Sequence, residues 1–123
     1  MTINIKATNT ELTPAISTYV EEKVLGLDKF IFAKDPESVL ANVEIGLSTK
    51  HHQSGKVFRA EINLHIGGKY LRAVSEQEDL YTAIDEMRDQ VAREITSLKN
   101  KEKDLFRRGG AAIKDFLKGI KRK

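Results

Sequence analysis

Hydrophobic and polar residues alternate along four stretches of the chain, and this period of two is typical of half-buried β-strands. The four stretches are residues 2–7, 39–48, 57–66 and 70–75. The third is the clearest, because its even-numbered positions from 58 onward are apolar and the positions between them are polar. Gly67 and Gly68 follow it directly. Two glycines between alternating runs predict a tight hairpin, because primed turns require positive φ.

Two other stretches carry apolar residues at intervals of three and four, which is the spacing of one face of an α-helix. The first begins at Thr13 and Pro14, since threonine caps helices well and proline suits the first turn. Its apolar face consists of Ile16, Val20, Val24, Leu27 and Ile31. The second begins with the acidic run Glu76-Gln77-Glu78-Asp79, which favours a helix N-terminus, and extends to Lys103. Its apolar face consists of Leu80, Ile84, Met87, Val91, Ile95 and Leu98.

The predicted elements follow the order β-α-β-β-β-α. Each strand has one apolar face, so we expect both helices to cover the same side of a four-stranded sheet, which gives an α+β two-layer sandwich. The other face of the sheet is expected to be polar and exposed to solvent. The chain of 123 residues fits one domain. We place this domain at residues 1–103 and expect a basic, flexible C-terminal tail at residues 104–123.

The formal charge of +3 is distributed unevenly. Residues 104–123 contain seven Lys or Arg and two Asp, a net charge of +5, whereas residues 1–103 have a net charge of −2. A nucleic-acid surface on the folded part must therefore be a local patch, for which the lysine-rich end of the last helix is the candidate. The tail is interpreted in three ways: as a solvated segment of the free protein, as an arm that follows RNA, or as a surface helix that meets lipid or a partner protein.

The residues do not indicate an enzyme or a metal protein. There is no cysteine, which excludes disulfides and thiolate metal sites. His51 and His52 are adjacent and converge poorly on one ion, and no arrangement of Ser, His and Asp or of paired carboxylates stands out. The N-terminus lacks the apolar stretch of a signal peptide, and no apolar run approaches the roughly 20 residues that span a bilayer. We therefore expect a cytoplasmic protein, monomeric when free, that has no cofactor, metal or membrane partner.

Two segments resemble a known family. The run Asp79-Leu80-Tyr81-Thr82-Ala83-Ile84-Asp85, within the segment from Gly68 to Arg93, is fairly specific to that family. A second matching segment extends from Ile3 to Phe30. On these residues the sequence resembles the ribosome hibernation promoting factors, also called ribosome-associated inhibitors or ribosomal subunit interface proteins. The resemblance covers roughly residues 1–103.

This resemblance implies a domain similar to double-stranded RNA-binding domains and binding to the small ribosomal subunit, in the channel where messenger and transfer RNA lie. It also implies a hibernation role, in which translation is inhibited and idle ribosomes are protected under stress or in stationary phase. Longer members of the family carry an additional C-terminal domain that pairs ribosomes. We expect a short form here, because only about twenty residues follow the last predicted helix. Whether this chain promotes or prevents ribosome pairing is left open.

The residues expected to bind RNA are basic. The resemblance contributes Lys23, Arg93, Lys99, Lys101 and Lys103, which match basic positions of the family. We add Arg88, which helical spacing places on the same flank as Lys99 and Lys103, and the basic pair that follows, Arg107 and Arg108. Lysine is missing at three positions where many relatives carry it, namely Gly26, Gln90 and Ser97, so we expect a weaker patch than in those relatives.

Other interpretations of the same residues are possible. The basic residues can be an ordinary solvated helix face. Tyr81 can stack on a base or fill the rim of the core, and we favour the core. A protein-interaction or regulatory module without RNA binding would use the open face of the sheet, which carries Lys6, Glu44, Arg59, Glu61, His65 and Arg72. A small hydrolase or metal enzyme is the third class, and we expect metal analysis to find none.

Overall fold

The structure of the protein is a computed structural model that describes residues 1–31, 36–48 and 55–108. The elements in chain order are β1 (Thr2–Thr8), α1 (Pro14–Leu25), the 3₁₀ helices η1 (Gly26–Phe30) and η2 (Pro36–Ser38), β2 (Leu40–Ser48), β3 (Val57–Ile66), β4 (Lys69–Gln77) and α2 (Leu80–Arg108). The predicted loop at His51 and His52 and the basic tail beyond Arg108 lie outside the described residues.

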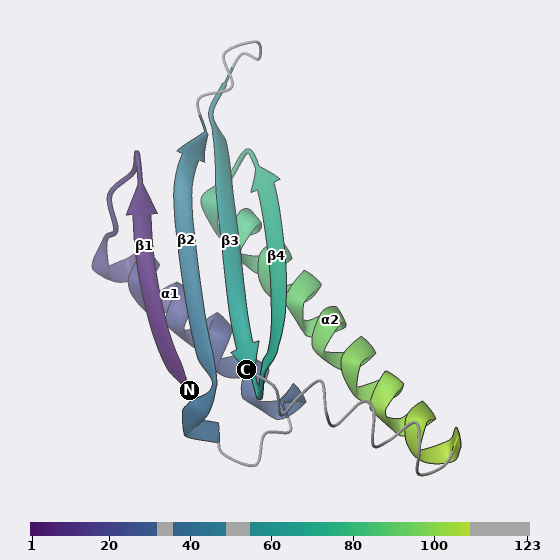
Figure 1. Ribbon diagram of the computed structural model, residues 1–123. Helices are drawn as coiled ribbons and strands as arrows, with labels where there is room; N and C mark the ends of the chain where they lie inside the picture. Colours follow the sequence, from purple (N-terminus) through teal and green to yellow (C-terminus); the bar gives the residue numbers. More distant parts are fainter. Residues whose placement is uncertain (32–35, 49–54, 109–123) are drawn as a thin grey trace.

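The four strands form one sheet in the order β1-β2-β3-β4. β1 is parallel to β2, so the chain crosses between them through α1, whereas β3 is antiparallel to both β2 and β4. Both helices lie on the same face of this sheet (Figure 1). The predicted α+β two-layer sandwich with its β-α-β-β-β-α order is therefore confirmed, with two short 3₁₀ helices added between α1 and β2.

The core lies between the sheet and the helix layer. The side chains of the two central strands that face the helices are buried: Ala41, Val43, Ile45, Ala60, Ile62 and Leu64. They belong to one apolar cluster with the buried residues of the helices: Val20, Val24, Ile84, Met87, Val91 and Ile95. Burial of apolar surface is the main force that holds such layers together. It fixes α2 as far as Ile95, and none of the described side chains after Ile95 is buried.

The predicted hairpin and the first helix cap are confirmed. Gly67 and Gly68 connect β3 to β4 with φ values of 52° and 85°, a conformation that side chains other than glycine rarely adopt. At the start of α1, the Thr13 hydroxyl accepts a hydrogen bond from the Ile16 N–H at 3.2 Å, and Pro14 occupies the first helical position.

The acidic run before α2 does not form a single cap, so this part of the prediction is wrong. β4 extends to Gln77, because Glu76 pairs with Arg59 and Gln77 pairs with Phe58 on the neighbouring strand. Asp79 alone caps the helix, where its carboxylate accepts a hydrogen bond from the Thr82 N–H at 3.0 Å.

The helix ends also differ from the predicted ones. α1 ends at Leu25, and the chain tightens into η1 from Gly26, which is a poor helix former. Leu27 remains buried because the 3₁₀ turn still directs it into the core. α2 continues to Arg108, past the predicted end at Lys103, because no Gly or Pro interrupts it before position 109. The end of α2 consequently extends beyond the sheet (Figure 1).

Candidate nucleic-acid interface

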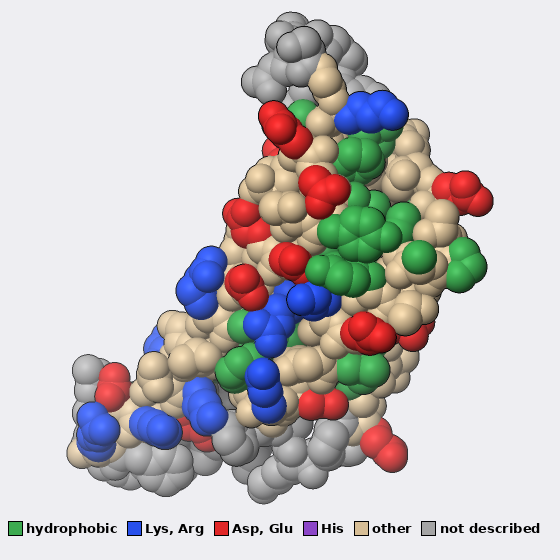
Figure 2. All heavy atoms as spheres, turned by 180° about the vertical axis from the view of Figure 1, so that it is seen from behind, with side chains coloured by type: hydrophobic (Ala, Val, Ile, Leu, Met, Phe, Trp, Pro, Cys, Tyr) green, Lys and Arg blue, Asp and Glu red, His purple; other side chains and the backbone are tan. Residues whose placement is uncertain are grey.

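The charge of α2 changes sign along its length. Residues 80–90 contain three acidic residues and one basic residue, whereas residues 99–108 contain five basic residues and two acidic ones. We call residues 99–108 the distal segment. Figure 2 shows Lys and Arg side chains along the part of α2 that extends beyond the sheet. At a rise of about 1.5 Å per residue, the helix continues for roughly 20 Å after Ile95, the last buried residue among its described side chains.

The distal segment carries most of the predicted RNA-binding residues. Lys99, Lys103 and Arg107 follow one another at intervals of four, so they lie on one side of the helix over about 12 Å. Lys101 and Lys103 are exposed. The Arg107 side chain is 79% exposed and lies 3.7 Å from the Asp104 carboxylate, a solvated contact that leaves the guanidinium accessible. Lys101 lies on another side of α2, and the side chain of Arg108 is outside the described part.

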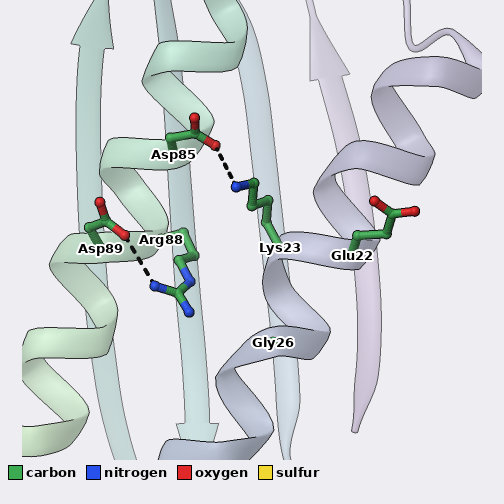
Figure 3. A pocket seen from close by; sticks show the side chains of 6 residues that line it. All are labelled: Glu22, Lys23, Gly26, Asp85, Arg88 and Asp89. Carbon is green, nitrogen blue, oxygen red and sulfur yellow. Dashed lines mark hydrogen bonds and ion pairs between the residues drawn. The ribbon is translucent and has the colours of Figure 1, made fainter.

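The other two predicted residues near α1 face a cleft between the helices. Lys23 of α1 and Arg88 of α2 line a cavity of about 330 Å³ together with Glu22, Gly26, Asp85 and Asp89 (Figure 3). Each cation has a carboxylate partner, because Lys23 Nζ lies 3.3 Å from Asp85 Oδ1 and Arg88 Nη1 lies 3.1 Å from Asp89 Oδ1. The two cations of the cleft are therefore each paired with one carboxylate, Asp85 or Asp89.

Asp85 is the centre of the contacts between the two helices. Its carboxylate also accepts a hydrogen bond from the Tyr19 hydroxyl at 2.6 Å. This carboxylate raises the pKa of both Tyr19 and Lys23, in each case mainly through the hydrogen bond. The Tyr19 ring packs edge-to-face against Tyr81 with 4.8 Å between the ring centroids. Tyr81 is nevertheless 40% exposed, so it lies at the rim of the helix layer.

Phe30 connects the cleft to the exposed part of α2. The Arg88 guanidinium lies 5.6 Å from the centroid of the Phe30 ring, within the range of a cation–π contact. Phe30 also lines a shallow hollow with Arg93, which is exposed, and a second one with Lys99, which is half-buried. Arg88, Arg93 and Lys99 thus surround one aromatic side chain, and the predicted residues from 88 to 99 are brought together around it.

Sequence reasoning missed two features of this surface. Lys29 was not predicted, yet its ammonium group lies 5.2 Å from the centroid of the same Phe30 ring. Its position results from the change to a 3₁₀ helix at Gly26, which a regular helical projection does not include. Gly26 has the Arg88 guanidinium as neighbour, 3.9 Å from the point that a Cβ would occupy. Arg88 therefore places a cation beside this glycine.

The opposite face of the sheet is polar, as predicted, and its main cluster is internally paired. Glu61 contacts Arg59 at 2.7 Å and Arg72 at 2.8 Å. The hydrogen bond from Arg72, with further ones from Asn63 and Arg59, lowers the pKa of Glu61 to about 2. His65 packs edge-to-face against Tyr70, and Thr8 donates a hydrogen bond to Glu44.

Two kinds of site are absent from the part of the chain that the structure describes. None of the helices in these residues is long and apolar enough to cross a membrane. No three His, Asp or Glu side chains gather where they could hold a metal ion, again within residues 1–31, 36–48 and 55–108.

The sequence matches a family and several of its members. The model of the family described as Sigma 54 modulation protein / S30EA ribosomal protein matches residues 3–103. A ribosome hibernation promoting factor of Klebsiella oxytoca is 34% identical over 104 residues, which cover 84% of this chain and 98% of that protein. The ribosome hibernation promotion factor of Bacillus subtilis is 32% identical over 111 residues, which cover 90% of this chain but only 55% of that protein. The chain thus spans about half the length of this longer relative.

Two solved structures have the same fold. The N-terminal domain of Thermus thermophilus Protein Y superposes with a TM-score of 0.67 at 31% identity and covers 80% of this chain and 99% of its own length. A ribosomal subunit interface protein from Coxiella burnetii superposes with a TM-score of 0.63 at 15% identity, which supports the fold alone. Both superpositions cover about four fifths of this chain.

Proposed function

The chain belongs to the Sigma 54 modulation protein / S30EA ribosomal protein family, and from this premise we propose that it is a ribosome hibernation factor. It binds the small ribosomal subunit in the channel of messenger and transfer RNA and contacts ribosomal RNA there. It keeps idle ribosomes inactive under stress or in stationary phase, and it acts in the cytoplasm, where the ribosomes are. The names of the relatives support the ribosome as partner, and the charges of the distal segment support the contact with RNA.

The single observation that carries this proposal is the basic distal segment on a domain matched over residues 3–103. Ribosomal RNA presents a dense array of phosphates, and each Lys or Arg that meets one releases condensed counterions. The exposed Lys101, Lys103 and Arg107 extend away from the packed part of the domain, so several phosphates can be reached without unfolding.

The mode of action follows from occupation of space. A folded RNA channel is recognised by its shape and its phosphates, and phosphate contacts do not read sequence. A rigid two-layer domain that fills the channel excludes messenger and transfer RNA by steric overlap. This activity requires no catalytic group, and the role is that of a binding protein rather than an enzyme.

The test is co-sedimentation of the protein with purified small subunits over a series of salt concentrations, followed by competition with transfer RNA. We expect that binding weakens steeply as the salt concentration rises. We also expect that transfer RNA and the protein exclude each other from the small subunit. Absence of binding, or binding that ignores salt, would refute the RNA contact. Simultaneous binding of protein and transfer RNA would refute the position in the channel but not the contact itself.

The open face of the sheet is the weaker candidate for the functional surface. Arg59 and Arg72 share the single carboxylate of Glu61 across this face, so both guanidinium groups already have a partner within the molecule and the three side chains retain a net charge of only +1. Alanine substitutions at Arg72 and His65 are therefore expected to leave co-sedimentation unchanged. Loss of binding in these variants would favour a protein-interaction role for this face.

A further inference from the structure

The ammonium group of Lys23 already has a partner inside the protein. Lys23 Nζ lies 3.3 Å from the Asp85 carboxylate across the cleft between α1 and α2 (Figure 3). It also lies 5.3 Å from the centroid of the Tyr19 ring, and the Tyr19 hydroxyl donates to the same carboxylate. Glu22 points away from α2, so it does not compete for Lys23 in the cleft (Figure 3).

An RNA phosphate must displace Asp85 before it can pair with Lys23. The exchange is possible, because the side chains of Lys23 and Asp85 are 39% and 44% exposed and ion pairs this accessible are weak. It gains little, however, since one carboxylate contact is lost for each phosphate contact that forms. The Asp85 charge also stays in the cleft, held by Tyr19, where it repels the incoming phosphate.

We propose that Asp85 is a residue that sets RNA affinity, because it holds Lys23 in an internal ion pair that a phosphate has to displace. This inference rests on the proposed function and adds a regulatory residue to the same surface. In the free protein, Asp85 binds Lys23 and Tyr19 together. In the complex, the Lys23 ammonium group exchanges from Asp85 to a phosphate oxygen, and Tyr19 retains the carboxylate.

Opposite effects on affinity are expected for the two members of the ion pair, Asp85 and Lys23. Removal of the Asp85 charge frees Lys23 and removes a repulsive charge, so binding becomes tighter. Removal of the Lys23 charge in the native protein costs little, since the contact it makes with RNA replaces one that it loses. The same removal costs more once Asp85 is neutral, because Lys23 then makes a full phosphate contact.

The experiment measures the dissociation constant for small subunits at several salt concentrations for Asp85→Asn, Lys23→Gln and the double variant. Asparagine keeps an oxygen that accepts the Tyr19 hydrogen bond, so the fold is preserved, and thermal unfolding checks this. The control is Glu94→Gln, which removes one acidic charge from an exposed position of the same helix that has no ion-pair or hydrogen-bond partner among the described residues.

We expect Asp85→Asn to bind about fivefold more tightly, the factor that corresponds to one unit charge at contact distance in water. The slope of log K against log salt should change by less than about 0.7, the value of one whole phosphate contact, because Lys23 meets a phosphate in both complexes. Lys23→Gln should weaken the native protein by less than about twofold and the Asp85→Asn variant by about fivefold. Glu94→Gln should change affinity by less than about twofold, because an exposed charge at a distance is screened.

Equal effects of Asp85→Asn and Glu94→Gln would overturn the inference, since only net charge would then matter. Tightening by Asp85→Asn that is equally large in the Lys23→Gln background would overturn it as well, because the release of Lys23 would not be the cause. If the native protein binds and Asp85→Asn binds more weakly, Asp85 supports the site and the inference is wrong while the proposed function stands. If the native protein does not bind small subunits at all, both fail together.

Discussion

The contribution of the distal segment to RNA binding can be tested with the double substitution Lys103→Gln and Arg107→Gln. These two residues lie four positions apart on one side of α2, about 6 Å along its axis. Lys103 is exposed, and the Arg107 side chain is 79% exposed. Glutamine is also a good helix former, and the Arg107–Asp104 contact that is lost is a weak exposed one. The substitution therefore removes two charges and leaves the fold in place.

The magnitude follows from counterion release. Each phosphate contact contributes about 0.7 to 0.9 to the slope of log K against log salt, so the loss of two contacts makes the slope shallower by about 1.4 to 1.8. Since affinity varies with salt concentration raised to this power, the dissociation constant at about 0.1 M salt should rise by about 25- to 60-fold. At high salt the variant and the native protein should converge.

The assay is a salt series of dissociation constants measured by co-sedimentation with small subunits, with a control that carries the same loss of charge. Lys6→Gln with Lys56→Gln provides this control, because Lys6 lies on β1 and Lys56 directly precedes β3, and both are exposed. The control should shift affinity by only a few fold. Two results would refute the assignment of the distal segment as a phosphate-binding surface. One is a slope of log K against log salt in the Lys103 and Arg107 variant that equals the native slope, and the other is an equal loss of affinity in both double variants.

Two further predictions concern stability. Glu61→Gln should lower the free energy of unfolding at neutral pH by about 1 to 2 kcal/mol. Arg72 above all, together with Arg59, holds the pKa of Glu61 at about 2. The arginines are partly exposed, so solvent screening reduces the contribution of this pKa shift to stability. A lowered pKa stabilises the fold at pH values above the unfolded pKa of 4.5, and this stabilisation is lost as the pH falls through about 2. In urea titrations, the difference in the free energy of unfolding between the native protein and the variant should therefore vanish toward pH 2. Asp79→Ala should cost about 1 kcal/mol in thermal unfolding, because the Thr82 N–H loses its acceptor. An unchanged melting temperature would mean that another group caps α2.

Most of the fold was predictable because it is encoded locally. The period of two in residues 57–66 and the Gly67–Gly68 pair specify a strand and its turn without any information from distant residues. Thr13 and Pro14 specify the start of α1 in the same way. Since each predicted strand had one apolar face, a single helix layer on that face of the sheet followed directly.

Two features were missed because distant residues decide the outcome. Glu76 has a suitable type for a helix start, but pairing with Arg59 on β3 extends the strand through it. The contacts of Asp85 in the cleft are a clearer case, because Asp85 lies 66 positions from Tyr19 in the sequence and meets Tyr19 and Lys23 only when α1 and α2 pack on the same sheet. Basic residues can be identified from sequence, but the carboxylate that neutralises one of them is a property of the tertiary structure.

The two halves of α2 have different physical requirements, and the distal segment depends on the other half. A helix of about ten residues is marginal in water, because nucleation of the first turn is costly. Residues 99–108 avoid this cost, since they continue a helix whose residues Ile84, Met87, Val91 and Ile95 are packed against the sheet. The buried half therefore provides both the nucleus and the direction of the segment. The position of the distal cations is set by the core, so the RNA-binding surface that we propose is a property of the folded domain and not of its basic sequence alone.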